Sequence, residues 1–435
     1  MTEFSEVRTS FRQMASCLAV ERVSLLRPKR EVTRRCDPLP QQPHETPVPD
    51  GGAKPFRVAL PESLLADLRE RLDRTRWPDE IPGSGWSYGM SLPYARELAA
   101  YWKDEYDWRA QEAKLNAFEQ YSAPLKGIDL HFIHERGDGD DPVPILLLHG
   151  WPSSVWEFHK MIHLLTDAGE HGGFSVVVPS LPGYGFSFRP FQDRFGLVDC
   201  ADALSELMTG VLGYEEYVIA AGDWGAHIGT RMAYAHPDAV LGLHLNMLSL
   251  RRDPGWPDRP SEEESAYLRE LGEWLHEETG YSLLQGMRPQ TPAYALTDSP
   301  IGLAAWIVEK FARWSDSDGD PERRFSKDDL ITTVMIYWAT GAIGSSFWPY
   351  YTRHHGEWIV NDLIPEGRRI ETPTCYIQFP CEIIRPPRSL AERLFNLRRW
   401  TVANSGGHFP ALEEPDILTE SIIRFVAELR DERDT

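Results

Sequence analysis

Short apolar runs alternate with segments of helix length beyond residue 126, and this alternation constrains the fold more than any other feature. The runs have the length of strands and lie at 128–133, 143–148, 174–178, 217–221, 375–379 and 400–402. Strands that alternate with helices form βαβ units, in which neighbouring strands run parallel. The sequence therefore predicts an α/β protein with a mostly parallel central sheet.

A first region of helical periodicity precedes this alternation. Leucines recur at helical spacing between residues 64 and 72, and a second helix is predicted around Leu98. Residues 1–53, which precede this helical region, mix Arg pairs with Pro and Gly and show no sustained hydrophobic period. We expect a flexible leader followed by a helical accessory segment.

A second helical region interrupts the strand pattern late in the chain. A capping box at Ser261 and Glu264 opens a helix, and residues 301–314 and 330–337 are helical in period. A helical insertion at this point is typical of a lid over an active site. The predicted organisation is a leader at 1–53, an accessory segment at 54–136, a core at 137–252 and 351–430, and a lid at 253–350.

Charge and composition limit the partners. The formal net charge of -21 repels phosphate backbones, so nucleic acid is excluded as a partner. No apolar run reaches about 18 residues, which predicts no membrane anchor, and the first residues do not resemble a signal peptide. We expect a cytoplasmic protein, and the preference for Arg over Lys points to a bacterial source. The five scattered cysteines favour neither disulfides nor a metal site.

The segment from Tyr217 to Gly229 carries the strongest functional signal. It reads as strand, sharp turn and helix, with the small residues Ala221 and Gly225 two positions either side of Asp223. This spacing is that of a nucleophile elbow, in which small neighbours allow a strained turn that exposes one side chain. An ordinary turn with Asp as a helix N-cap is the plainer alternative.

Four further residues complete the predicted catalytic arrangement, and the carboxylate and the histidine follow Asp223 in the expected chain order. The motif that begins at His149 follows a buried strand, and the amides of Trp151 and Trp224 would form an oxyanion hole. His408, in a Gly-rich loop after the last strand, is the candidate base. Glu382, which lies between Asp223 and His408 in the sequence, is its candidate carboxylate partner.

These motifs together resemble the epoxide hydrolases of the α/β-hydrolase fold, specifically the microsomal type. The resemblance runs from about residue 55 to 429 and is carried by the motifs at 149–152, 183–187, 222–225, 379–382 and 406–409. The accessory segment resembles the one that distinguishes this type from shorter hydrolases. The resemblance implies hydrolysis of an epoxide with water to a vicinal diol, without metal or organic cofactor.

The resemblance also implies two lid tyrosines that hold the epoxide oxygen. By motif match these are Tyr281 and Tyr350, with Tyr351 open as an alternative because Trp348 and Thr352 depart from the family pattern. Trp348, Phe347 and Trp306 are expected to line a pocket for a bulky apolar or aromatic epoxide. The sequence does not decide whether this substrate belongs to catabolism or to secondary metabolism. It also leaves the oligomeric state open, with a homodimer among the alternatives.

The residue types suit a two-step reaction. A carboxylate is ionised at neutral pH, so Asp223 can attack a saturated carbon without activation and form an ester. His408, oriented by Glu382, would then activate the water that hydrolyses this ester.

Two other functions compete with this interpretation. A haloalkane dehalogenase shares the aspartate elbow and the ester chemistry, but it binds halide through N–H donors, whereas the paired tyrosines favour an epoxide oxygen. A non-catalytic ligand-binding protein of the same fold is disfavoured by the intact set of Asp, Glu and His. Chloride release or tight binding without turnover would distinguish them.

Overall fold

The computed structural model describes residues 52–138, 142–167, 173–248, 250, 259–355, 364 and 368–433. Residues 1–51 of the predicted leader, which include Cys17 and Cys36, lie outside these ranges. The unit described here begins after Pro49.

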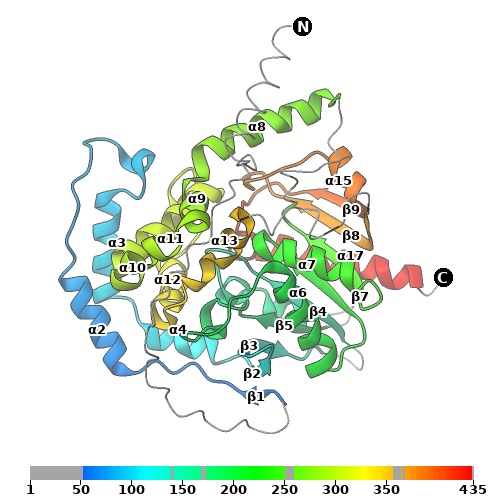
Figure 1. Ribbon diagram of the computed structural model, residues 1–435, viewed down its shortest axis with the longest axis horizontal. Helices are drawn as coiled ribbons and strands as arrows, with labels where there is room; N and C mark the ends of the chain where they lie inside the picture. The colour runs from blue at the N-terminus through cyan, green and yellow to red at the C-terminus, as the bar shows by residue number, and fades with distance from the viewer. Residues whose placement is uncertain are drawn as a thin grey trace, which may run out of the picture. The chain divides into compact units, whose positions relative to one another are not determined.

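A sheet of nine described strands forms the centre of the unit (Figure 1). Its order is β1-β2-β3-β5-β4-β6-β7-β8-β9. The pairs β1-β2, β2-β3 and β3-β5 are antiparallel. The remaining pairs, from β5-β4 to β8-β9, are parallel. The strands are β1 (Lys54–Pro55), β2 (Gln120–Leu125), β3 (Ile128–Glu135), β4 (Val143–Leu148), β5 (Phe174–Pro179), β6 (Tyr217–Ala221), β7 (Val240–Leu245), β8 (Ile370–Gln378) and β9 (Phe395–Val402). The predicted mostly parallel α/β sheet is confirmed.

Helices cover both faces of this sheet. On β7 the adjacent residues Gly242 and Leu243 point to opposite faces; Gly242 lies against α17, and Leu243 lies against Gly229 of α7. Burial on both faces explains why β5 and β6 are continuous apolar runs. The core helices are α5 (Ile162–Thr166), α6 (Leu197–Glu206), α7 (Asp223–Ala235), α15 (Arg388–Leu394), α16 (Pro410–Glu413) and α17 (Pro415–Arg433).

Between β7 and β8, the described residues include six helices of an inserted region. They are α8 (Glu262–Glu278), α9 (Gly280–Met287), α10 (Gln290–Asp298), α11 (Pro300–Trp314), α12 (Lys327–Thr340) and α13 (Trp348–His354). The predicted capping box is present, because Ser261 accepts from the amide of Glu264 and the Glu264 carboxylate accepts from the amide of Ser261. The predicted lid boundary at 350/351 falls inside α13.

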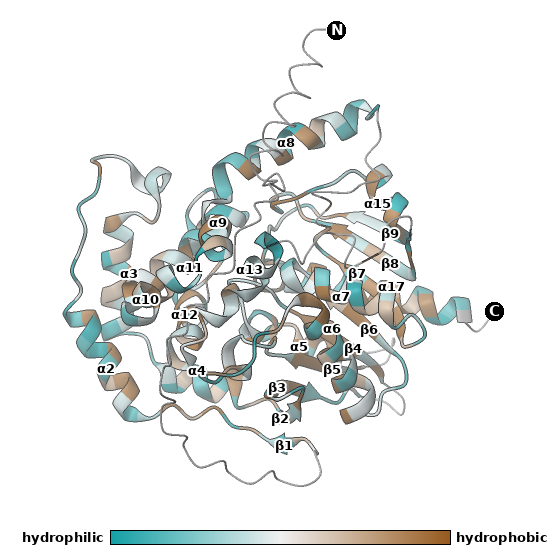
Figure 2. Cartoon of the chain, in the orientation of Figure 1, coloured by the Kyte–Doolittle hydropathy of each residue, from teal (hydrophilic) through white to brown (hydrophobic). Residues whose placement is uncertain are grey.

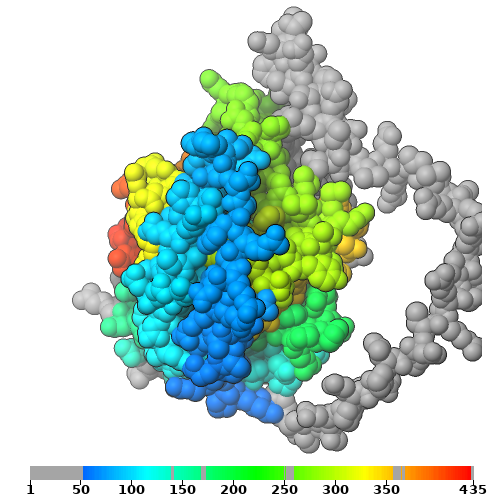
Figure 3. Space-filling model, turned by 90° about the vertical axis from the view of Figure 1, so that its left-hand side faces the viewer, coloured from blue at the N-terminus to red at the C-terminus, as the bar shows by residue number. Residues whose placement is uncertain are grey.

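The accessory segment packs on this inserted region. Its helices are α2 (Glu62–Asp73), α3 (Leu92–Asp104) and α4 (Trp108–Leu115), and its end supplies β2 and β3 to the sheet. The phenols of Tyr101 and Tyr106 hydrogen-bond Asp328 and Thr332 of α12, each at 2.9 Å. Figure 3 shows the segment in blue and cyan beside the yellow-green helices.

The helices that face solvent are amphipathic, as their sequences predict. In Figure 2, teal and brown residues share the surfaces of α2 and α8. On α2 the buried residues are Leu65, Leu68 and Leu72. No single described helix is long and apolar enough to cross a membrane, although the sharply bent pair Lys327–Thr340 and Ser345–His354 meets the length and composition test jointly.

Candidate active site

Asp223 lies at a strained turn between β6 and α7. Its φ of 43° places a non-glycine residue in the left-handed region. Small neighbours make the turn possible: a Cβ at Gly225 would lie 2.3 Å from the Leu148 carbonyl oxygen, and one at Gly150 would lie 2.2 Å from Asp223 Oδ1. The geometry is that of the predicted elbow.

The Asp223 carboxylate is surrounded by groups that favour its charge. The Trp151 amide donates to its Oδ1 at 2.8 Å, and His408 Nε2 lies 3.6 Å from its Oδ2. Burial raises the pKa of Asp223, but His408 and the amides of Trp151 and Trp224 together lower it by more. The pKa therefore falls below the usual value. Asp223 is therefore ionised at neutral pH.

His408 and Glu382 form a buried pair beside Asp223. Nδ1 of His408 lies 2.6 Å from Oε1 of Glu382, and both side chains are almost completely buried. Burial lowers the pKa of His408, but the charges of Glu382 and Asp223 outweigh burial and raise it to about 10. At neutral pH the imidazole is therefore protonated and lies between two carboxylates.

The parallel sheet explains why residues so distant in sequence meet. Trp151 follows β4, Asp223 follows β6, Glu382 follows β8, and His408 follows β9. Parallel strands place their carboxyl ends at one edge, which is where α/β proteins build their sites.

Tyr281 and Tyr350 lie over this edge from α9 and α13. The Tyr281 ring stacks on Trp151 with centroids 5.1 Å apart. The Tyr350 ring packs edge-on to Trp224 at 4.8 Å and lies 5.7 Å from Tyr281. Burial raises the pKa of Tyr350 well above 10, so its phenol stays protonated.

Tyr351 lies elsewhere. It is partly exposed and stacks on Trp348 and His355, with centroids 5.0 and 3.9 Å apart. Among the aromatic contacts of the described residues, neither Tyr351 nor Trp348 touches Trp151 or Trp224. The geometry thus places Tyr350, and not Tyr351, beside Asp223.

The other predicted pocket residues divide in the same way. Phe347 is fully buried, with its ring 6.4 Å from that of Trp151. Trp306 donates its indole N–H to Gln285 at 3.0 Å and is partly exposed. Phe347 therefore packs near Trp151, whereas Trp306 contacts Gln285 and Trp348 contacts Tyr351, so their role in the pocket stays a prediction.

Three residues near the site were not predicted. Trp314 packs edge-on to His408 and also contacts Tyr281, both at 5.2 Å. Lys310 Nζ lies 4.8 Å from the centre of the Tyr281 ring, and a buried Lys in the apolar run 301–314 was a signal that could have been read.

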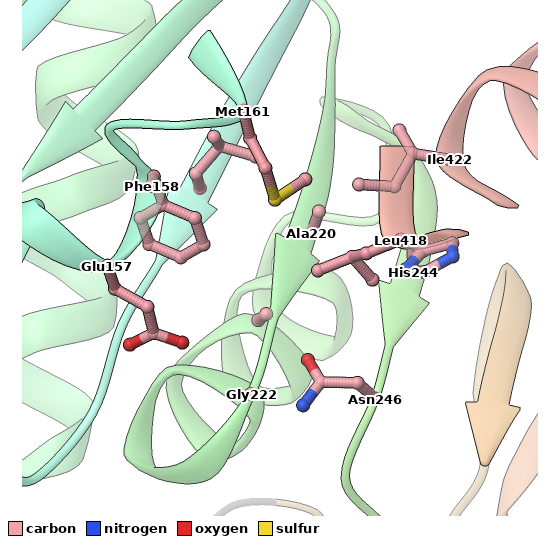
Figure 4. A pocket seen from close by; sticks show the side chains of 11 residues that line it. Glu157, Phe158, Met161, Ala220, Gly222, His244, Asn246, Leu418 and Ile422 are labelled. Carbon is pink, nitrogen blue, oxygen red and sulfur yellow. The ribbon is translucent and has the colours of Figure 1, made fainter. Parts of the chain in front are cut away.

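Glu157 is the third of these residues. It lines a small cavity beneath the elbow with Gly222, His244 and Asn246 (Figure 4). Burial raises its pKa to about 7, even though Ser153 and His408 act to lower it. Its sequence context gave no sign of this burial, since an acid in a helical stretch resembles a surface residue.

Within the described ranges, no group of three or more His, Cys, Asp or Glu side chains could hold a metal ion. Cys200, Cys375 and Cys381 are free thiols.

Two protein families and several known proteins match this chain. The family described as the epoxide hydrolase N terminus matches residues 53–158, and the alpha/beta hydrolase fold family matches residues 143–341. Epoxide hydrolase 1 of Oryctolagus cuniculus is 37% identical over 408 residues, which cover 87% of this chain and 89% of that protein. The chain belongs to the epoxide hydrolases.

Solved structures support the same assignment. The juvenile hormone epoxide hydrolase of Bombyx mori matches with a TM-score of 0.76 and 30% identity, over 88% of this chain and 95% of that one. The Aspergillus niger epoxide hydrolase matches with a TM-score of 0.77 and 30% identity, over 87% and 97%. The predicted α/β-hydrolase fold, the microsomal type and the epoxide hydrolase activity are confirmed.

Proposed function

We propose that this epoxide hydrolase works through a covalent ester of Asp223, with His408 and Glu382 as base and orienting carboxylate. One observation carries the proposal: the two Asp223 oxygens face different partners. Oδ1 accepts from the Trp151 amide at 2.8 Å, while Oδ2 lies 3.6 Å from His408. One oxygen is thus held in an oxyanion hole, and the other is left to attack.

The first step opens the ring. Oδ2 of Asp223 attacks one epoxide carbon, the C–O bond of the ring breaks, and the electron pair stays on the epoxide oxygen. Tyr281 and Tyr350 donate hydrogen bonds to that oxygen, and one of them transfers a proton to it. The phenolate regains a proton from the protonated His408 through solvent, so His408 becomes neutral.

The second step releases the diol. Ester formation removes the Asp223 charge, which is one of the causes of the raised pKa of His408, so the imidazole can now remain neutral and accept a proton. It takes this proton from a water molecule that attacks the ester carbonyl. The oxyanion forms at Oδ1, facing the amides of Trp151 and Trp224. Collapse breaks the bond between the carbonyl carbon and Oδ2, which leaves with the diol and takes the second proton of the attacking water. The Asp223 carboxylate is thereby restored, and His408 is again protonated.

Side chains and amides of the chain carry every step, so we propose that the reaction needs no metal or organic cofactor. The ring of Trp151, whose amide binds Asp223, packs against the rings of Tyr281, Phe347 and Tyr350. An aromatic surface of this kind favours a bulky apolar or aromatic epoxide.

A second candidate activity, haloalkane dehalogenation, has one observation in its favour. The indole N–H of Trp151 is buried and meets no hydrogen-bond acceptor in the described part of the chain. Indole donors of this kind suit a leaving halide.

Product analysis separates these activities. Purified enzyme is incubated with styrene oxide and, in parallel, with 1-chlorohexane, and the Asp223→Asn variant serves as the control. We expect styrene glycol from the wild type, no chloride, and no diol from the variant. Chloride release without diol would support the dehalogenase, and diol from Asp223→Asn would contradict the ester mechanism.

A further inference from the structure

A buried carboxylate that the proposed reaction does not use fastens the loop of His408. Glu413, at the end of α16, accepts from the Phe409 amide at 2.9 Å through Oε1. Its Oε2 accepts from the Asp316 amide at 2.9 Å, and the Gly407 amide also interacts with the carboxylate. Glu413 therefore holds the two amides that flank His408, although it does not contact the imidazole.

Asp316, just beyond α11, completes the attachment from the side of the lid. Its Oδ2 accepts from the Gly406 amide at 3.1 Å, and its Oδ1 lies 3.5 Å from the Cys381 thiol. Cys381 immediately precedes Glu382. Asp316 thus links the end of the lid helix to both loops that carry the buried pair.

Three further contacts stabilise this junction. The His408 amide donates to the Trp314 carbonyl at 2.8 Å. Arg324 pairs with both Asp316 and Glu414, the second at 2.8 Å. Contacts from Trp314, Asp316 and Arg324 therefore converge on residues 406–414, and they form one polar junction between the lid and the base.

Fastening the loop matters because the imidazole must satisfy two partners at once. Its Nδ1 lies 2.6 Å from Glu382, and its Nε2 lies 3.6 Å from Asp223. A displacement of about 1 Å in such a geometry costs roughly 100-fold in rate. A loop of two glycines has little stiffness of its own.

We propose that Glu413 and Asp316 are positioning residues for His408, which hold its imidazole in reach of Glu382 and Asp223 through the backbone of the loop. The proposal rests on the proposed function, because His408 serves ester hydrolysis there. Both residues therefore act on the second step and leave the first step largely intact.

Single-turnover kinetics with enzyme in excess over styrene oxide test this. Ester formation is followed by tryptophan fluorescence, since Trp151 and Trp224 flank Asp223, and ester is quantified by acid quench and mass spectrometry. In Glu413→Gln one acceptor oxygen becomes an NH₂ donor that faces an amide donor. We expect ester hydrolysis to slow about 10- to 100-fold, ester formation to change less than about threefold, and ester to accumulate. Asp316→Asn should give the same pattern, more weakly.

Two matched variants complete the design. Glu413→Asp keeps both acceptor oxygens and should recover part of the hydrolysis rate. Asp318→Asn removes a charge two residues from Asp316, at an exposed side chain paired with Arg323, and should leave both rates unchanged. If Glu413→Gln does not fold, Asp316→Asn carries the test, because the Asp316 side chain is 28% exposed.

The outcomes are distinguishable. Folded Glu413→Gln and Asp316→Asn enzymes that hydrolyse the ester at the wild-type rate would overturn the positioning role, as would an equal loss in both steps. His408→Gln is the reference for a missing base. Failure of this variant to accumulate ester would overturn the proposed function, and the positioning role with it.

Discussion

Asp223 combines a strained backbone with a stabilised charge, and the two properties have different origins. The left-handed φ depends on small neighbours that the sequence displays openly. The low pKa depends on His408 and two amides that only the fold brings together. The elbow could therefore be predicted from the residue types, whereas the lowered pKa of the carboxylate could be found only from the tertiary structure.

Adjacent tyrosines on α13 allow a matched test of the proton donor. We expect Tyr350→Phe to slow ester formation about 10- to 100-fold, because one of two phenols that can donate to the epoxide oxygen is lost. Tyr351→Phe, which alters a ring stacked on Trp348, should change it less than about twofold. Single-turnover ester formation is the measurement, and a larger effect from Tyr351→Phe would contradict the placement of Tyr350.

The buried acid Glu157 predicts a pH dependence of stability. Its pKa in the folded state, about 7, lies above the usual value of 4.5. The folded state therefore holds the proton more tightly, and stability is lost as pH rises from about 4.5 to 7. Glu157→Gln removes this loss, so its stability relative to wild type should rise over that window, by on the order of 3 kcal/mol, and stay constant above it.

Chemical denaturation at pH 5 and pH 8 measures this effect. The control is Glu263→Gln, at an exposed residue of α8, which should not change the difference between the two pH values. If the stability of Glu157→Gln relative to wild type does not rise between pH 5 and pH 8, the Glu157 carboxylate is solvated or paired at both pH values.

At the scale of elements, six strands could be predicted because each is a compact apolar run. β7 was missed because Gly242 and His244 interrupt its pattern. The absence of a side chain at Gly242 suits its packing, since a Cβ there would lie 2.5 Å from the Leu429 side chain and 2.9 Å from the Phe425 ring. β2 was missed because Pro124 and polar residues are tolerated in a strand that is only partly buried. Hydrophobic periodicity in the sequence does not predict strands whose residue types depend on packing against a particular neighbour.

The start of α7 gives a prediction at the same scale. Gly225→Ala should destabilise the protein by about 1–3 kcal/mol, since its Cβ would meet the backbone of β4. It should also lower the rate of ester formation by displacing the Trp224 amide. Gly280→Ala at the start of α9 is the control, because nothing lies within 4 Å of its Cβ. Unfolding midpoints measure both, and equal midpoints would contradict the close packing of α7 on β4.

A large hydrophobic core extends from Val58 in the accessory segment to Val426 in α17, and a small second cluster consists of Cys375, Phe425 and Leu429. Trp102 of α3 belongs to this core and is 3% exposed. Trp102→Ala should therefore cost about 3–5 kcal/mol and shift one cooperative unfolding transition. Tyr88→Ala, at an exposed ring, is the control. A separate early transition in Trp102→Ala would show that the accessory segment unfolds independently.

The chain order of the proposed catalytic residues Asp223, Glu382 and His408 could be predicted at this scale, because each residue follows its own strand of the sheet. Glu157 could not be predicted from the sequence, since its burial comes from what packs around it. Lys310 could have been noticed as a Lys within an apolar run, but its contact with the Tyr281 ring required the structure. The register of the second tyrosine also needed coordinates, because Tyr350 and Tyr351 are neighbours that differ only in the direction their rings take from α13.

The ester at Asp223 is the central claim, and isotope transfer tests it most directly. Enzyme in excess turns over styrene oxide once in ¹⁸O-labelled water, and mass spectrometry follows the diol and the peptide that contains Asp223. We predict label in Asp223 and an unlabelled oxygen from the protein in the first-turnover diol. Diol labelled directly from water, with an unlabelled Asp223 peptide, would contradict the covalent mechanism.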